Sequence, residues 1–158
     1  MKKVLLITAL FTYASMVNAQ EIKKIKATDV VKILDTTNHP LVINLWTTWC
    51  GPCVNELRYF EKVVDKFKDQ NVELVLISID YPEDYAKVAP FVAKKGYKVK
   101  VYWLDEQETT VIQTVIDRGF EGSIPFSIFS NNATKYRFSH SAQLTENQLK
   151  KELEKLVK

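Results

Sequence analysis

Apolar residues along this chain follow two kinds of pattern. A continuous apolar run over residues 41–46 predicts a central strand that is buried on both faces. Directly after it, apolar side chains recur at steps of three and four residues, at Cys53, Leu57, Phe60, Val64 and Phe67. That spacing predicts a helix that packs one stripe of side chains onto the sheet. Pro52 suits the first turn of this helix, because its missing N–H is not needed there.

The alternation of strand and helix patterns continues towards the C-terminus. Residues 72–79 predict a second buried strand, and the segment over 82–96 predicts a helix with a kink at Pro90. Alternating apolar positions over 98–104 predict a further strand, which is followed by a helix over 106–117. Strands that alternate with helices in this way form parallel crossovers. We therefore expect an α/β fold with a largely parallel sheet.

The last part of the chain has a different pattern. Two short strands over 126–130 and 135–139 flank the residues 131–134, which predicts an antiparallel hairpin with a four-residue loop. The final helix begins at a capping box, in which Thr145 and Gln148 exchange hydrogen bonds with each other's backbone N–H groups. The sheet is therefore expected to be mixed and to end in two antiparallel strands.

The N-terminal segment is predicted to be a targeting sequence. Residues 1–19 carry a basic start and an apolar stretch that ends at Ala19, as a cleaved secretory signal peptide does. An uncleaved N-terminal membrane anchor is the alternative, although the apolar stretch is shorter than the ~20 residues that span a bilayer. After it, residues 22–27 predict an edge strand, and Thr28 is the expected N-cap of a short helix.

Composition and charge indicate a single globular domain and say little about its function. The chain has 158 residues, of which 46% are hydrophobic and 26% charged, as expected for one globular domain over residues 20–158. The formal charge is +3, or +1 once residues 1–19 with their two lysines are set aside. Such a small net charge gives no indication of nucleic-acid binding.

Both cysteines lie in the pentapeptide Trp49-Cys50-Gly51-Pro52-Cys53, between the central strand and its helix. Two intervening residues put their Cα atoms about one turn apart, inside the window of roughly 4.4–6.8 Å that a disulfide bridges. A bridge across so short a loop constrains little of the unfolded chain, which argues against a structural staple. At a helix start the backbone N–H groups favour a thiolate. Redox chemistry is the prediction, with Cys50 as the outer nucleophile and Cys53 as its buried partner.

These features together resemble the thioredoxin superfamily. They are a central strand that leads into the Trp-Cys-Gly-Pro-Cys motif, the crossovers, and an Ile124-Pro125 pair just before a terminal hairpin and helix. The predicted signal peptide, the run over 45–53 and Glu56 are most similar to exported thiol-disulfide oxidoreductases of the TlpA/ResA type. The resemblance implies a thioredoxin-like fold, a mixed central sheet flanked by helices, with an extra helix-strand insertion before a cis-proline.

The resemblance also implies a mechanism. Cys50 attacks a client disulfide, Cys53 resolves the mixed disulfide, and the Cys50–Cys53 disulfide remains. Pro125 matches the family's cis-proline, and an X-Pro bond can be held cis at modest cost. Ile124 and Pro125 are then expected to contact the backbone of the substrate. Trp49, Gly51 and Pro52 complete the expected substrate surface.

Glu56 is the expected acid-base residue. It lies one turn past Cys53 and corresponds to an acidic residue that, in this subfamily, influences deprotonation of the buried cysteine; a solvated helix glutamate is the alternative. Ordinary thioredoxins instead use a buried aspartate and a lysine. Asn44 and Leu76 occupy those two positions here, so that acid-base pair is absent.

Other site types are less compatible with the sequence. His39 and His140 could complete a zinc site with the two cysteines, but their spacing forms no ligand motif, so we expect no metal. Val54 stands where covalent haem attachment needs histidine. Thr47 lies three residues before Cys50, as a threonine does in peroxiredoxins, and this resemblance gives a thiol peroxidase partial support. A non-catalytic thioredoxin-fold binding module is the alternative that is not an enzyme.

The sequence thus predicts an exported, periplasmic protein, soluble after signal cleavage, that reduces disulfides in client proteins without a cofactor. The resemblance implies a membrane-embedded thiol electron donor that keeps it reduced. For relatives of this type, it also implies cytochrome c maturation as one role, beside general disulfide repair.

Overall fold

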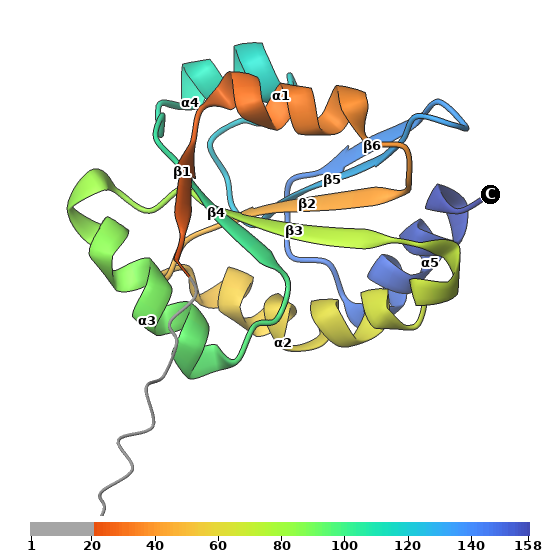
Figure 1. The fold of residues 1–158 in the computed structure, drawn as a ribbon, viewed down its shortest axis with the longest axis horizontal. Helices are drawn as coiled ribbons and strands as arrows, with labels where there is room; N and C mark the ends of the chain where they lie inside the picture. Colours follow the sequence, from red (N-terminus) through yellow and green to blue (C-terminus); the bar gives the residue numbers. More distant parts are fainter. Residues whose placement is uncertain (1–20) are drawn as a thin grey trace, which may run out of the picture.

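The computed structural model describes residues 21–158, and these residues form a six-stranded sheet between two layers of helices (Figure 1). The predicted signal peptide over residues 1–19 lies outside the described residues. The strands are β1 (Lys23–Ile25), β2 (Leu41–Trp46), β3 (Glu73–Ser78), β4 (Lys100–Leu104), β5 (Phe126–Asn131) and β6 (Tyr136–His140). Within the described part of the chain, no helix is both long and apolar enough to span a membrane.

The sheet is mixed, as predicted. Its order is β1-β4-β3-β2-β5-β6, with β1, β4, β3 and β2 parallel to one another, β5 antiparallel to β2, and β6 antiparallel to β5. All six residues of β2 are buried, because strands lie on both sides of it and helices cover both faces. In the register of the sheet, Asn44 of β2 lies opposite Leu76 of β3 and Ser127 of β5.

The helices divide between the two faces of the sheet. Figure 1 shows α1 and α4 above the sheet and α2, α3 and α5 below it. The helical elements are α1 (Ala27–Thr36), α2 (Gly51–Asp65), α3 (Tyr85–Lys95), α4 (Thr109–Val111) and α5 (Glu146–Leu156), with the shorter turns η1 (Lys68–Gln70), η2 (Pro82–Asp84) and η3 (Ile112–Ile116). The element α3 continues across Pro90.

Each face of the sheet has its own hydrophobic core. Successive strand residues point to opposite faces, so Ile43 and Leu45 of β2 join the cluster under α1, while Val42 and Trp46 join the cluster around α2, α3 and α5. Cys53 belongs to this second cluster and is fully buried. The predicted apolar stripe of α2 therefore does hold the second cysteine inside the protein.

The predicted N-cap of α1 is wrong. Thr28 lies inside the helix, which begins at Ala27 with Lys26 as the N-cap. Two carboxylates satisfy the first backbone donors: Asp29 accepts from the Lys26 N–H at 2.9 Å, and Glu106 accepts from the Ala27 N–H at 2.6 Å. The second acceptor is remote in sequence, so the local pattern pointed to the wrong residue.

The segment over 106–117 forms much less α-helix than predicted. One α-helical turn over α4 passes directly into the π-turn η3, in which the Asp117 N–H donates to the Ile112 carbonyl oxygen at 3.0 Å. The run from Thr109 to Ile112 is entirely β-branched, and such side chains lose rotamer freedom in an α-helix. The weak helix propensity of this run is consistent with the short element.

The hairpin is present but its loop is displaced by one residue. The strand β5 extends through Asn131, which pairs with Tyr136, and the loop covers residues 132–135 instead of 131–134. The Asn131 side chain donates to the Leu156 carbonyl oxygen at 2.8 Å, which attaches the end of β5 to α5. Lys135 closes the loop with a positive φ of 57°. Packing against α5 therefore sets the end of the strand.

Side chains cap two helix ends. The predicted capping box is confirmed: the Thr145 hydroxyl accepts from the Gln148 N–H, and the Gln148 side chain accepts from the Thr145 N–H. At the other side of the molecule, Asn132 donates to the carbonyl oxygens of Leu34 and Thr37, each within 3.0 Å, and so closes the C-terminal end of α1. The hairpin loop and α1 are thereby joined.

Candidate active site

Cys50 and Cys53 form a disulfide at the N-terminus of α2. Their Cα atoms are 5.3 Å apart, within the range predicted from the two-residue spacing. Cys50 is the N-cap residue of α2, and its sulfur accepts a hydrogen bond from the Cys53 N–H at 3.2 Å. The positive end of the helix therefore lies at the first sulfur, where it stabilises a thiolate once the disulfide is reduced.

The two cysteines differ in exposure. Cys50 retains 6% of its accessible surface, whereas Cys53 has none. Gly51 and Pro52, which lie between them, are exposed. The residue that keeps accessible surface is thus Cys50, which the sequence predicted to be the outer cysteine, and Cys53 is the buried partner.

The Ile124-Pro125 bond is cis, as predicted. Pro125 is buried and directly precedes β5, the antiparallel neighbour of β2. The carbonyl oxygen of Ile124 lies 3.9 Å from the Cys50 sulfur. A disulfide sulfur carries no hydrogen to donate, so this is a contact and not a hydrogen bond. The geometry brings the cis-proline loop beside the outer cysteine.

Glu56 is fully buried, so the alternative of a solvated helix glutamate is excluded. One carboxyl oxygen accepts from the Asn44 side-chain amide at 2.8 Å, and the other accepts from the Leu144 N–H at 2.9 Å. Burial raises the pKa of Glu56 from 4.5 to about 7, although both hydrogen bonds lower it. The carboxyl group therefore changes its charge near neutral pH.

Asn44 connects Glu56 to the strand beyond it. Its amide nitrogen also lies 3.0 Å from the Ser127 hydroxyl, while its Oδ1 atom has no hydrogen-bond partner among residues 21–158. Leu76 lies opposite Asn44 in the neighbouring strand β3. The pair of positions that holds aspartate and lysine in ordinary thioredoxins thus holds an amide and an alkyl side chain, and the buried carboxylate comes from α2.

The loop before Cys50 is held by a residue that the sequence reasoning did not assign to the site. Asp80 is fully buried and accepts hydrogen bonds from the Thr48 N–H, the Thr48 hydroxyl and the Ser78 hydroxyl. Asp80 lies just beyond β3, and Thr48 just beyond β2, at the carboxyl ends of adjacent parallel strands. An acidic residue at the end of a buried strand beside the motif strand was the available signal.

Two large aromatic side chains are exposed beside the disulfide. Trp49 is 56% exposed and stacks against Tyr81, which is 53% exposed; their ring centroids are 6.0 Å apart and their planes differ by 12°. Trp49 was expected at the substrate surface, whereas Tyr81 was not. Trp46, by contrast, is fully buried, in agreement with the prediction that the strand over 41–46 is buried on both faces.

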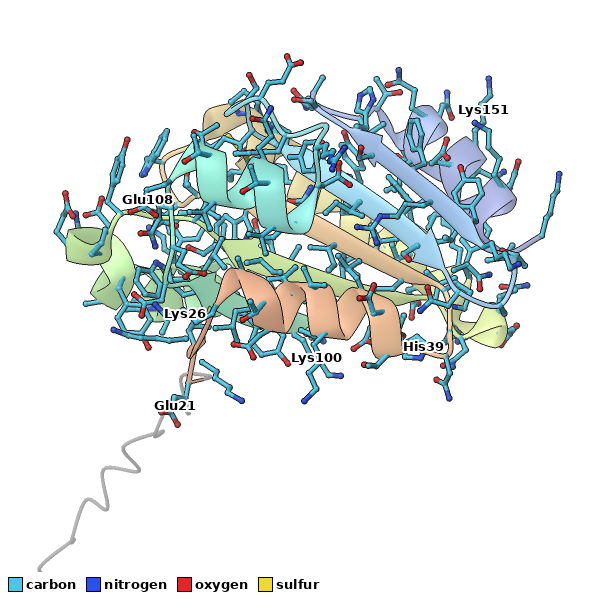
Figure 2. The ribbon with its side chains drawn as sticks, turned by 90° about the horizontal axis from the view of Figure 1, so that it is seen from above. Glu21, Lys26, His39, Lys100, Glu108 and Lys151 are labelled. Carbon is cyan, nitrogen blue, oxygen red and sulfur yellow. A yellow bond between two sulfur atoms is a disulfide. The ribbon has the colours of Figure 1, made fainter. Side chains whose placement is uncertain are left out.

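His39 lies apart from the cysteines. His39 precedes β2, at the opposite end of the strand from Cys50, and its Nε2 atom is 2.7 Å from a Glu73 carboxyl oxygen. Lys100 bonds the same carboxylate; burial would raise the pKa of Glu73, but these partners lower it below its usual value. Figure 2 shows His39 and Lys100 at the periphery of the protein. Among residues 21–158, no three His, Cys, Asp or Glu side chains form a cluster that could hold a metal.

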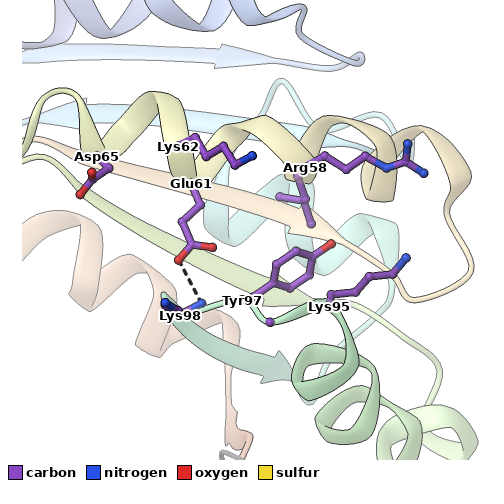
Figure 3. Close-up of a pocket in the computed structure, with 9 residues that line it drawn as sticks. Arg58, Glu61, Lys62, Asp65, Lys95, Tyr97 and Lys98 are labelled. Atoms are coloured by element: carbon purple, nitrogen blue, oxygen red, sulfur yellow. Dashed lines mark hydrogen bonds between the residues drawn. The ribbon is translucent and has the colours of Figure 1, made fainter.

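A pocket of about 620 Å³ lies further along α2, without either cysteine in its lining. Figure 3 shows Glu61 of α2 extending towards Lys98, which with Tyr97 leads into β4, while Arg58 and Lys62 extend along α2. Glu61 accepts a hydrogen bond from the Lys98 N–H at 3.0 Å. The pocket is open and lined mainly by charged side chains, and it is separate from the disulfide.

The fold and the site define a thioredoxin-like protein with a Cys-x-x-Cys disulfide at the start of its central helix and a cis-proline beside it. The AhpC/TSA family model matches residues 13–134, and the chain belongs to that family.

Proteins named thiol-disulfide oxidoreductase ResA are similar to this chain. The protein from Bacillus cereus is 28% identical over 127 residues, which is 80% of this chain and 69% of that protein. The protein from Oceanobacillus iheyensis is 34% identical over 53 residues, 34% of this chain and 28% of that protein. The Bacillus anthracis protein is 32% identical over 71 residues, 45% of this chain and 40% of that protein. In two of the three, the chain spans less than half of the relative's length.

Solved structures agree on the fold. A thioredoxin-related protein from Neisseria meningitidis serogroup B has a TM-score of 0.64 at 20% identity, over 78% of this chain and 89% of that one. A thiol:disulfide interchange protein described as DsbE, from Chlorobium tepidum, has a TM-score of 0.63 at 17% identity, over 78% and 84%. A secreted disulfide oxidoreductase of Mycobacterium tuberculosis has a TM-score of 0.59 at 18% identity, over 77% and 84%. At these identities the likeness establishes the thioredoxin-like fold alone.

Proposed function

We propose that this protein is an exported thiol-disulfide oxidoreductase that reduces disulfides in client proteins through a Cys50/Cys53 dithiol-disulfide cycle. The observation that supports it most directly is the arrangement of the two cysteines: Cys50 of the bridged pair is the N-cap of the central helix and retains some accessible surface, whereas Cys53 has none. The names of the ResA relatives support the same activity.

The cycle transfers two electrons from the reduced protein to the client. The Cys50 thiolate attacks one sulfur of the client disulfide; a new sulfur-sulfur bond joins Cys50 to the client, and the second client sulfur leaves as a thiolate. Cys53 then loses its proton and attacks the Cys50 sulfur, which releases the first client sulfur. The client gains two electrons and two protons as a dithiol, and the protein is left with the Cys50–Cys53 disulfide.

Glu56 is proposed to assist the second step. It lies one turn past Cys53 on the same helix face, and a group with a pKa of about 7 can take up and release a proton near neutral pH. In this role the carboxylate accepts the proton of the Cys53 thiol as the mixed disulfide is resolved. Asn44 and the Leu144 N–H hold the carboxyl group in place.

The client segment is proposed to bind across Cys50, between two walls. Ile124 and Pro125 form one wall, where the Ile124 carbonyl oxygen lies near the sulfur and offers a backbone contact. Trp49 forms the other wall, and Gly51 and Pro52 continue it along the exposed start of α2. An extended segment can place its disulfide between these walls.

The cellular setting is also a proposal. Residues 1–19 would direct export and be removed, so that a single domain over 20–158 acts in the periplasm, with an uncleaved membrane anchor as the alternative. A membrane-embedded thiol donor would return electrons to the oxidised pair. Cytochrome c maturation is one process that needs such reduction.

The test compares three forms of the chain without residues 1–19: wild type, Cys50→Ser and Cys53→Ser. Each is reduced, freed of reductant and mixed with a disulfide-bonded protein, and released thiols are counted. Wild type should reduce the substrate, Cys50→Ser should be inactive, and Cys53→Ser should stop at a mixed disulfide that mass spectrometry detects. Wild type no more active than Cys50→Ser would refute the proposal.

Thiol peroxidase activity is the second candidate, because Thr47 lies three residues before Cys50 in a member of this family. The Thr47 side chain is buried, and its hydroxyl has no hydrogen-bond partner within residues 21–158. Peroxide consumption by the reduced chain, compared with Cys50→Ser, measures this activity. A chain inactive in both assays would be the non-catalytic binding module.

A further inference from the structure

The two most exposed large hydrophobic side chains in the described part of this protein lie beside the disulfide. Among residues 21–158, the large hydrophobic side chains that are substantially exposed are Trp49, Tyr81, Val115 and Phe138. Trp49 and Tyr81 stack on one another, although they belong to loops that follow different strands. We call these two rings the aromatic pair. Stacked, exposed aromatic rings at a reaction centre are typical of binding surfaces.

The loops that carry the aromatic pair are held together from inside. Thr48, which precedes Trp49, donates two hydrogen bonds to the carboxylate of Asp80, which precedes Tyr81. The Asp80 carbonyl oxygen accepts from the buried Trp103 side chain at 2.9 Å. Pro82 follows Tyr81 and begins η2, and proline restricts the backbone there. The rings are therefore supported by a buried network and are arranged before any partner binds.

The aromatic pair continues the proposed client surface beyond Trp49. The Ile124 carbonyl oxygen of the cis-proline loop lies 3.9 Å from the Cys50 sulfur, and Trp49 is the chain neighbour of Cys50. If the backbone of a client segment lies along Ile124, its side chains extend outward from that backbone. A client side chain that extends towards Trp49 also contacts Tyr81, because the two rings are stacked.

We propose that the aromatic pair binds an aliphatic or aromatic side chain located within one or two residues of the client cysteine that Cys50 attacks, and that Tyr81 thereby determines substrate preference. This rests on the proposed reductase function. Glu83 and Asp84 follow Tyr81 after Pro82, and Asp84 already pairs with Lys87 at 2.5 Å. The exposed carboxylate of Glu83 disfavours an acidic side chain at this position.

The experiment measures kcat/KM for short peptides with one disulfide, in which the residue beside the attacked cysteine is Leu, Phe, Ser or Glu. Bis(2-hydroxyethyl) disulfide is the substrate that lacks any such side chain. The variants are Tyr81→Ala, Tyr81→Phe, which keeps the ring, and Phe138→Ala, which removes an exposed ring from β6. Thermal unfolding of each variant checks that it is folded.

For wild type, kcat/KM should be highest for the Leu and Phe peptides and lowest for the Glu peptide. Tyr81→Ala should lower kcat/KM for the Leu and Phe peptides by about tenfold, as expected when an interface aromatic anchor is truncated. The Ser peptide and bis(2-hydroxyethyl) disulfide should be reduced at nearly the wild-type rate, and Tyr81→Phe and Phe138→Ala should leave the preference intact.

An equal loss on all substrates, or no loss on the Leu and Phe peptides, would overturn the role of Tyr81 while leaving the reductase function in place. Wild type that fails to reduce even bis(2-hydroxyethyl) disulfide would overturn the proposed function itself. The two failures are therefore distinguishable in the same set of measurements.

Discussion

Replacement of Glu56 by glutamine should remove a pH dependence of folding stability that a buried carboxyl group creates. Glutamine has nearly the same shape but cannot ionise. The pKa of Glu56 in the folded protein is about 7, against an ordinary value of 4.5. The difference is about 2.5 pH units, and at 1.36 kcal/mol per unit, ionisation of Glu56 disfavours the folded state by about 3 kcal/mol.

The sign follows from where the proton is bound. Below pH 4.5, Glu56 is neutral in both the folded and unfolded states. Between pH 4.5 and 7 the unfolded chain releases the proton while the folded chain keeps it, so the free energy of unfolding decreases as the pH rises. The loss is complete above the folded-state pKa. Alkaline conditions should therefore weaken the wild-type fold through this one residue.

The assay is urea denaturation of the oxidised wild type and Glu56→Gln at several values between pH 5 and 8. Other carboxyl groups titrate in both proteins, so the informative quantity is the difference between their free energies of unfolding. This difference should change by about 2–3 kcal/mol over the range, in favour of the glutamine variant at high pH. Glu154→Gln, which removes an exposed carboxylate of α5 paired with Lys150, is the control and should give no such change. A difference between wild type and Glu56→Gln that does not vary with pH would refute the reasoning.

Three further substitutions test how the scaffold is held, each by urea denaturation. Thr145→Ala removes the cap of α5 and should cost about 1 kcal/mol, while Thr145→Ser should restore most of it; equal losses in both would contradict a capping role. Asn132→Ala removes the donors to Leu34 and Thr37 at the end of α1 and should cost about 1 kcal/mol; unchanged stability would show that these bonds contribute nothing net. Leu153→Ala opens a cavity at a fully buried site and should cost about 2–5 kcal/mol, with Leu153→Met losing much less; similar losses would exclude cavity formation as the cause.

Features encoded over short stretches of sequence were predictable. Three features depend on residues that are close together in the sequence. They are the strand before the disulfide, the apolar stripe that buries Cys53 and the capping box at Thr145. The cis bond at Pro125 was predicted from the family resemblance, because the residues next to a proline do not by themselves show whether its peptide bond is cis or trans. These predictions rested on periodicity or on a family pattern, and the structure contains each of them.

The environment of Glu56 was not predictable in the same way. Its two hydrogen-bond donors, Asn44 and Leu144, lie 12 and 88 residues away along the chain. Whether a helix glutamate faces solvent or a buried amide depends on how α2 is rotated against β2 and on where the chain passes before α5. The contact between Asp80 and Thr48 has the same origin, since it needs the ends of two strands to be neighbours. Long-range packing, and not local propensity, determines these parts of the site.

The unpaired Oδ1 atom of Asn44 determines what happens when Glu56 is neutral. In the present arrangement both carboxyl oxygens accept hydrogen bonds, so a proton on the oxygen that faces Asn44 would meet an N–H group. A half-turn of the amide brings Oδ1 to that position as the acceptor, and Ser127 then becomes a donor instead of an acceptor. Such a half-turn would reverse the direction of hydrogen bonding from Glu56 on α2 as far as Ser127 on β5, two residues beyond Pro125.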